Sequence, residues 1–493
     1  MPNIDFSIDL HTHPNYKPLG RSFQTTPGQQ SNSINSRNNL WYYDRPTFLD
    51  KLLNIIGGLT KFSQTNFTAG SYGKLWVITV GLGAIEKWFF NNKLGTGEIA
   101  DILEDFASEL GKPRINAIQS MKDYYADLVL EYSFLEQMHN TAVNIDGKKF
   151  VYRIVNNFLE LKVAVLENEM NIQAENQKPV IIALIPSIEG LHVLNCGIDP
   201  QRDFNNIKAN PAEVKQHAHD IKNNPRKPWF VTFAHHFYNE LCGHSLSLRG
   251  QVARSCDQHV GLNTGFTELG KEVLDILLDN SDGKRILVDI KHMSPLTRKQ
   301  FFKLREEKYP DIPVFVSHGV ANGLPDMNST ISNYPELGNT FNNGEINFYD
   351  EEILLMEKTG GIIGLQLDER RLASEETIKR TKHSIFRHKI MHYRSELLWR
   401  QVQYIAELLD SNGRFAWGNI GMGSDYDGIV DPLNSFWTTE QYPELKSYLE
   451  RHAHNYFQNH VDRLKNSFNK ITADLVVQNI FQNNAWSFFE RWF

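Results

Sequence analysis

Two histidines separated by one residue lie near the start of the chain, in the run Asp-Leu-His-Thr-His-Pro at 9–14. Residues 4–8 before them alternate between apolar and polar, which is typical of a strand, and Pro14 ends the hydrogen-bonding ladder after them. Because side chains two positions apart on a strand point the same way, His11 and His13 can reach one metal ion. The pair alone is weak evidence, since closely spaced histidines are more often ordinary surface residues.

The rest of the chain must position these histidines, and its sequence pattern predicts apolar strands that alternate with helices. The predicted strands are 4–8, 75–80, 180–188, 229–234, 285–290, 313–317, 361–367 and 420–424, and helical patterns at 268–278, 296–307, 350–358 and 393–409 separate most of the later ones. Eight strands alternating with helices favour an α/β fold of the (β/α)8 TIM-barrel type over an open doubly wound sheet.

We therefore expect residues 1–493 to form a single barrel domain with insertions at about 18–170 and 195–228. The first insertion follows the first strand and is expected to be mostly helical, with helical patterns at 99–110, 115–139 and 151–170. A polar tract at 15–39 is either a loosely ordered loop or a lid over the site.

Six of the predicted strands end in imidazole or carboxylate side chains. These side chains are His11, His13, Glu189, His235, His292, His318 and Asp425. In a barrel the carboxyl ends of all strands meet at one mouth, where the catalytic groups of this fold lie. Any one of these histidines is more often structural, but six such strand ends together predict a metal site.

Imidazole and carboxylate ligands without thiolate suit zinc or a similar divalent ion. His11 and His13 can hold one ion and His292 and His318 a second, with Glu189 bridging the two. A hydroxide shared by two cations has its pKa lowered towards neutrality and becomes a nucleophile. The pattern thus predicts two divalent metal ions, with zinc favoured, and metal-dependent hydrolysis.

Two further strand-end residues have predicted catalytic roles. Asp425 would orient the hydroxide and carry its proton to the leaving amine. His235 would donate a hydrogen bond to the oxyanion that develops on the attacked carbonyl.

Several motifs resemble those of the membrane (renal) dipeptidase family of the amidohydrolase superfamily. They are Ser-Ile-Glu-Gly at 187–190, Val-Asp-Ile-Lys-His at 288–292, Val-Ser-His at 316–318 and Gly-Met-Gly-Ser-Asp-Tyr-Asp-Gly at 421–428. The resemblance implies a (β/α)8 barrel with two zinc ions and dipeptide-like substrates. It also implies that Glu189 bridges the ions, that His292 and His318 bind the second ion, that His235 contacts substrate, and that Asp425 is the catalytic aspartate.

The chain departs from the family pattern at two positions. The family begins with His-x-Asp, whereas His13 here replaces a carboxylate by an imidazole and removes one negative charge. The family also has an arginine that grips the substrate carboxylate, and Ile346 stands in its place. We therefore expect hydrolysis of a small amide or peptide-like bond with only a weak preference for a free C-terminal carboxylate.

The composition of the chain indicates which kinds of molecule it can bind and which structural classes it does not fit. The chain has 493 residues, 41% hydrophobic and 22% charged, with a net charge of −7 and no basic stripe, so we expect a small-molecule or dipeptide-like substrate and no nucleic acid. Three cysteines without a C-x-x-C spacing exclude a disulfide framework and a thiolate zinc site. The longest apolar run, 75–85, is too short for a bilayer and the first residues lack a signal pattern, so a cytoplasmic protein without a membrane association is expected. The sequence leaves a homodimer open.

Two other functions share the metal-site prediction. A phosphoesterase of the histidinol-phosphatase-like type also begins Asp-Leu-His-x-His, but residues 14–17, Pro-Asn-Tyr-Lys, lack the acidic and glycine signature expected there. The second alternative is a barrel that binds metal without turnover.

Overall fold

The computed structural model describes residues 2, 4–57, 60–93, 95–173, 178–199, 203–248, 250–381, 386–429 and 431–493. Within them the strands are β1 (Ser7–Thr12), β2 (Leu75–Leu82), β3 (Val143–Ile145), β4 (Lys148–Ile154), β5 (Val180–Glu189), β6 (Phe230–Thr232), β7 (Leu287–Asp289), β8 (Val316–Gly319), β9 (Ile363–Leu365) and β10 (Ile420–Met422). All eight predicted strands are present, most of them shorter than or shifted slightly from the predicted ranges.

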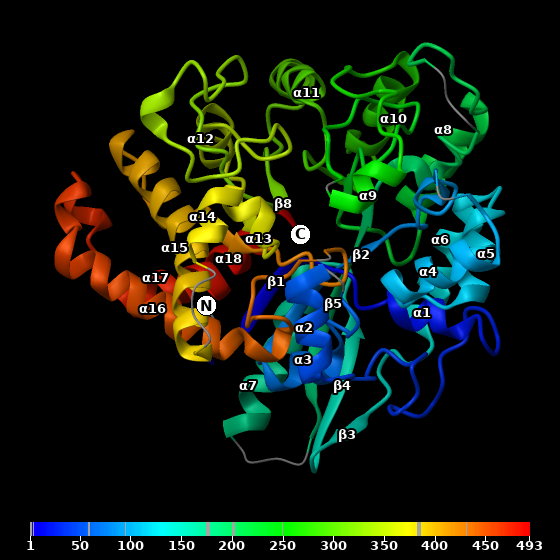
Figure 1. Ribbon diagram of the computed structural model, residues 1–493, viewed down its shortest axis with the longest axis horizontal. Coiled ribbons are helices and arrows are strands. Elements are labelled where there is room, and N and C mark those ends of the chain that lie inside the picture. The colour runs from blue at the N-terminus through cyan, green and yellow to red at the C-terminus, as the bar shows by residue number, and fades with distance from the viewer. Residues whose placement is uncertain are drawn as a thin grey trace.

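The helices surround the strands (Figure 1). They are α1 (Tyr16–Ser22), α2 (Phe48–Gly57), α3 (Phe67–Tyr72), α4 (Glu98–Ser108), α5 (Lys112–Gln119), α6 (Tyr124–Glu136), α7 (Phe158–Gln173), α8 (Pro211–Asn223), α9 (Gly250–Ser255), α10 (Glu268–Leu278), α11 (Pro295–Lys308), α12 (Asp350–Lys358), α13 (Glu369–Leu372), α14 (Glu375–Arg380), α15 (Arg387–Ser411), α16 (Tyr442–Asn459), α17 (Ala473–Gln478) and α18 (Asn484–Trp492). The predicted helices at 268–278 and 350–358 coincide with α10 and α12. A capping threonine explains the first boundary, since the Thr267 side chain accepts from the Gly270 backbone N–H.

The strand pairing follows the chain order that a barrel requires, but in two sheets. Parallel pairs link β1 to β2, β2 to β5, β5 to β6 and β6 to β7, and a second sheet has the order β10-β9-β8. The two sheets are joined by backbone hydrogen bonds at both of their edges. Between the β7 and β8 segments, the Ile290 N–H donates to the Phe315 carbonyl at 3.3 Å, and between the β10 and β1 segments the Asp425 N–H donates to the His11 carbonyl at 2.9 Å. The α/β fold is confirmed, whereas closure of the eight strands into one ring stays a prediction.

The large insertion is less helical than predicted. Residues 151–170 were expected to be helical, but β4 covers the start of this range and pairs with β3 on one side and with β5 on the other. Tyr152 and Ile154, two apart in β4, are both buried against the core, which fits the two-residue period of a strand. The predicted helix at 115–139 is divided into α5 and α6, because the Asp123 side chain accepts from the Ala126 backbone N–H and begins a new helix.

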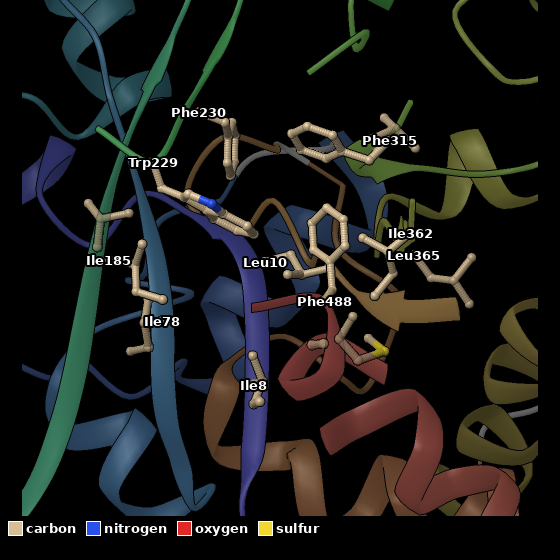
Figure 2. Close-up of a cluster of buried hydrophobic side chains, with 14 of the residues drawn as sticks. Ile8, Leu10, Ile78, Ile185, Trp229, Phe230, Phe315, Ile362, Leu365 and Phe488 are labelled. Carbon is tan, nitrogen blue, oxygen red and sulfur yellow. The ribbon is translucent and has the colours of Figure 1, made fainter. Parts of the chain in front are cut away.

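The core lies between the strands and the C-terminal helix. Figure 2 shows Ile8 and Leu10 of β1 in the same cluster as Trp229, Phe315 and the α18 residue, Phe488. The rings of Trp229 and Phe315 are stacked with centroids 6.3 Å apart, and both residues are buried. This close packing holds the strands in fixed positions relative to one another, so the residues at their carboxyl ends are rigidly supported.

The polar tract at 15–39 is not wholly a loop, because α1 begins at Tyr16. The Tyr16 ring stacks on the His13 ring with centroids 4.4 Å apart, so this segment packs directly beside the predicted site. A lid function of the tract stays untested. Over the described ranges, no helix is both long and apolar enough to cross a membrane.

Candidate metal centre

The structure brings all seven predicted site residues to one place. They are His11 in β1, His13 directly after it, Glu189 at the end of β5, His235 after β6, His292 after β7, His318 in β8 and Asp425 after β10. Four of these imidazoles have an Nε2 atom 3.1–3.4 Å from a carboxylate oxygen of Glu189. They are His11, His13, His292 and His318. His235 Nε2 lies 3.5 Å from the same carboxylate. The centre is therefore built around Glu189.

The neighbouring strand β2 shapes the space for the first two histidines. The Nε2 atoms of His11 and His13 are 3.1 Å apart, as expected for positions i and i+2. A Cβ atom at Gly81 would lie 2.6 Å from His13 Cε1 and 3.0 Å from His11 Cε1, so only glycine lets both rings pack against β2. The carbonyl of Gly81 also accepts a hydrogen bond from His13 Nδ1 at 3.0 Å.

A buried serine orients two more imidazoles. Ser317 Oγ donates its proton to Asp289 Oδ2 at 2.5 Å, so its oxygen accepts from His318 Nδ1 at 3.0 Å and from His11 Nδ1 at 3.3 Å. An imidazole that donates through Nδ1 presents an unprotonated Nε2. Together with His13, three histidines thus direct their Nε2 atoms towards Glu189, and orientation of this kind is typical of metal ligands.

The pKa shifts in the centre favour an ionised Glu189 and a neutral His292, which are the charge states that metal ligands need. Although burial alone would raise it, interactions with the imidazoles of His11, His235 and His13 hold the pKa of Glu189 well below its usual range. Burial lowers the pKa of His292 to about 3 despite its contact with Glu189, so this ring is neutral. Burial would also lower the pKa of His13, but hydrogen bonds and charges of Asp425 and Glu189 raise it to about 10. A cation between these groups would replace that proton.

The donor set fits two divalent ions. Two trios, His11–His13–Glu189 and Glu189–His292–His318, each have ligand atoms within 4.8 Å of one another, and every member is buried. The buried Nε2 of His318 makes no hydrogen bond. The members of both trios are histidines and one glutamate, so their donors are nitrogen and oxygen, which suit zinc or a similar divalent ion.

Asp425 lies on the open side of the centre. Its Oδ1 atom is 3.5 Å from His13 Nε2, and its Oδ2 atom is 3.8 Å from His318 Nε2. The backbone φ of Asp425 is +59° and that of His292 is +65°, a left-handed conformation that costs free energy in residues other than glycine. Strain of this kind concentrates at functional sites, and here it turns both side chains inward.

Two residues that the sequence reasoning missed hold the predicted ones in place. Gln366, directly after β9, donates from Nε2 to Asp425 Oδ2 at 2.6 Å. Glu86, after β2, places Oε2 2.7 Å from His235 Nδ1 and accepts from the Phe237 backbone N–H at 3.0 Å. Glu86 is buried; the charge of His235, against the effect of burial, keeps its pKa low. An acid soon after a buried strand was the available signal for Glu86.

The centre opens into a cavity of about 440 Å³. Its lining includes Tyr16, Lys17, residues of the insertion, and the basic residues Lys291, Arg370 and Arg371. Burial, together with the nearby charge of Arg371, lowers the pKa of Lys291 to about 7. Ile346, the residue in the place of the family arginine, also lines this cavity.

Comparisons with known proteins show the fold of dipeptidases. No protein-family model matches the chain, and no curated protein matches it by sequence. A solved dipeptidase, described as a metallopeptidase of family M19, shares 12% identity over 99% of this chain and 98% of its own, with a TM-score of 0.51. A metallopeptidase from Rhodobacter sphaeroides, solved with a phosphinate mimic of the dipeptide L-Ala-D-Ala, shares 12% identity over 99% of each chain, also with a TM-score of 0.51. The resemblance inferred from the motifs is thus confirmed at the level of fold.

Proposed function

We propose that this chain, which has the fold of the M19 dipeptidases, is a metal-dependent hydrolase of small amide or peptide-like bonds. The observation that carries the proposal is the convergence of four imidazole Nε2 atoms on the Glu189 carboxylate at the strand ends. His11 and His13 would hold one divalent ion, His292 and His318 a second, and Glu189 would lie between them. We also infer that the eight strands close into a barrel, since backbone hydrogen bonds cross both gaps between the sheets.

Two divalent ions in this centre would polarise the scissile carbonyl and lower the pKa of a water molecule between them. Asp425 would accept a proton from the attacking water and return it to the departing nitrogen, because its carboxylate faces the same space as the metal ligands. Gln366 holds one carboxylate oxygen of Asp425 and leaves Oδ1 for this transfer.

His235 would stabilise the negative charge that develops on the carbonyl oxygen. Its Nδ1 atom faces Glu86, so its Nε2 atom points towards the centre and can donate a hydrogen bond there. Burial alone would lower the pKa of His235, but the charges of Glu86 and Glu189 raise it, which favours the doubly protonated ring.

Glu86→Gln is expected to lower kcat about tenfold and leave the metal content unchanged. The amide keeps a hydrogen-bonding group beside His235 but removes the charge that keeps the ring protonated, so the alkaline limb of the pH–rate profile should move to lower pH. Steady-state kinetics across pH, with metal analysis and a thermal melt of each preparation, measure this. A rate loss without a displaced pH profile would contradict the role of the Glu86 charge.

The proposed function is tested on protein purified without chelator and reloaded with zinc. We expect about two equivalents of metal and hydrolysis of an amide or dipeptide panel that a chelator abolishes and zinc restores. Metal content near zero after reloading would exclude the dinuclear centre. Full metal loading with no turnover of any amide, alongside turnover of a phosphate monoester, would assign the site to phosphoester chemistry instead.

A further inference from the structure

The cavity over the metal centre has two walls of different chemistry. One wall belongs to the insertion and carries a group of apolar side chains beside polar ones such as Asn92 and Glu104. The other comes from the segments after β7 and β9 and carries the basic side chains of Lys291 and Arg371. A substrate in this cavity therefore has an apolar surface and basic side chains within the same lining as the centre.

The apolar wall consists of Ile85, Phe89, Phe90 and Leu110. Phe90 and Leu110 belong to a hydrophobic cluster separate from the main core, and Ile85 and Phe89 pack against it. The Phe89 ring meets the His236 ring edge-on with centroids 5.2 Å apart, and His236 in turn lies 5.0 Å from the His292 ring. This chain of contacts brings the apolar wall directly to the edge of the metal centre.

The cationic wall consists of Lys291 and Arg371. Lys291 precedes His292, and its Nζ atom lies 3.4 Å from Gln366 Oε1, the residue that also holds Asp425. Arg371, in α13, donates to the backbone carbonyl of Ser247. Figure 1 shows α13 near the centre of the view and the insertion helix α4 towards its right side.

Five acids line the cavity among the described residues, and four of them belong to the metal centre or pair with a basic side chain. They are Glu104, Glu189, Asp368, Asp425 and Asp427. Glu189 and Asp425 belong to the centre itself. Asp368 pairs with Arg370 at 2.6 Å and Asp427 with Lys17 at 3.0 Å. Burial raises the pKa of Glu104 to about 7, and its side chain accepts from Asn92 at 2.9 Å.

We propose that the substrate is an N-acyl amino acid, with its acyl chain on the apolar wall and its carboxylate at Lys291 and Arg371. Water would add to the acyl carbonyl, the C–N bond would break, and the nitrogen would take up a proton, which yields a carboxylic acid and a free amino acid. This inference rests on the proposed function and names its substrate. It revises the weak carboxylate preference expected from Ile346, because two cations from other segments reach the same cavity.

The test compares kcat/KM on zinc-loaded protein for N-acetyl-, N-hexanoyl- and N-decanoylalanine of both configurations, N-decanoylalanine amide and the dipeptide Ala-Ala. We expect the decanoyl compound to exceed the acetyl compound by about thirtyfold or more, since each methylene buried on an apolar wall strengthens binding severalfold. The free acid should exceed its amide by about tenfold or more, as expected for charge-assisted hydrogen bonds, and should also exceed Ala-Ala.

Two variants test which wall causes each preference, and a third serves as a control. Phe89→Ser should reduce the decanoyl-to-acetyl ratio, and Arg371→Gln should reduce the acid-to-amide ratio. Arg380→Gln is the matched control, because Arg380 is exposed on α14 and pairs with Glu376 one turn before it on the same helix. Calorimetric binding of N-decanoylalanine and of its amide to Asp425→Asn protein gives a readout independent of turnover, and it decides the carboxylate question if Arg371→Gln does not fold.

The outcomes separate the two proposals. Turnover of Ala-Ala above the acyl amino acids, or equal rates for all chain lengths, would overturn the substrate assignment and leave the hydrolase intact. Equal binding of the acid and the amide would overturn the cationic wall as a carboxylate site. Absence of turnover for every amide at full metal loading would overturn both proposals.

Discussion

Asp425→Asn is expected to lose about a hundredfold or more in kcat while it retains most of its metal, the usual range for a positioned acid–base group. The asparagine side chain occupies the same volume and can still meet Gln366, so the backbone and the metal ligands should stay in place. It has no carboxylate to accept the proton of the attacking water. The loss should therefore fall on the chemical step.

The geometry supports this separation of rate from metal content. Asp425 Oδ1 is 3.5 Å from His13 Nε2, which is farther than the 3.1 Å between His13 and Glu189. The Asp425 carboxylate lies 3.5–3.9 Å from the Nε2 atoms of His11, His13 and His318 and lines the cavity. We interpret Asp425 as a group that acts on the substrate side of the metal ions.

Metal analysis and single-turnover kinetics on the same preparation measure the Asp425 prediction. Asp427→Asn is the matched control: the Asp427 carboxylate accepts from the backbone N–H groups of Gln64 and Thr65 and pairs with Lys17, so its loss should lower stability more than turnover. A kcat within tenfold of wild type for Asp425→Asn would refute its role in proton transfer.

Much of this centre could be predicted because strand patterns and their terminal residues are local signals. The predicted strand at 420–424 and the observed β10 begin at the same residue, and Asp425 follows both. The parallel arrangement then brings the ends of separate strands together, so residues far apart in sequence converge without any long-range signal. This is why the seven site residues could be listed from sequence.

The positioning residues could not be predicted by the same reasoning. Glu86 lies four residues beyond the end of β2, and its position beside His235 depends on the path of an irregular segment. Gln366 lies within the predicted strand at 361–367, but a search for metal ligands does not consider an amide side chain. The charge of Arg371 enters the cavity only through the fold of α13. Local periodicity also cannot separate a buried strand from a helix over a few residues, which explains the error at β4.

Glu189→Gln is expected to lose metal and activity together, in contrast to Asp425→Asn. Glu189 Oε1 lies 3.2 Å from His292 Nε2 and 3.4 Å from His11 Nε2, and Glu189 Oε2 lies 3.1 Å from His13 Nε2. The carboxylate thus contacts predicted ligands of both ions. Glutamine would replace one oxygen by an N–H donor and remove the negative charge between two cations. In a buried site this exchange removes a ligand and its charge compensation at once.

Metal content after zinc reloading and dialysis measures the Glu189 prediction, with less than one equivalent expected against about two in the wild type. Glu86→Gln is the control, since Glu86 is also buried and also contacts an imidazole, yet it faces His235 away from the predicted ions and should keep its metal. A Glu189→Gln protein that binds two equivalents would show that this carboxylate does not bridge the ions. Among the described residues, Glu189 is the carboxylate that the two ligand trios share. A Glu189→Gln protein that retains both its metal and its rate would therefore show that Glu189 is not part of the metal centre.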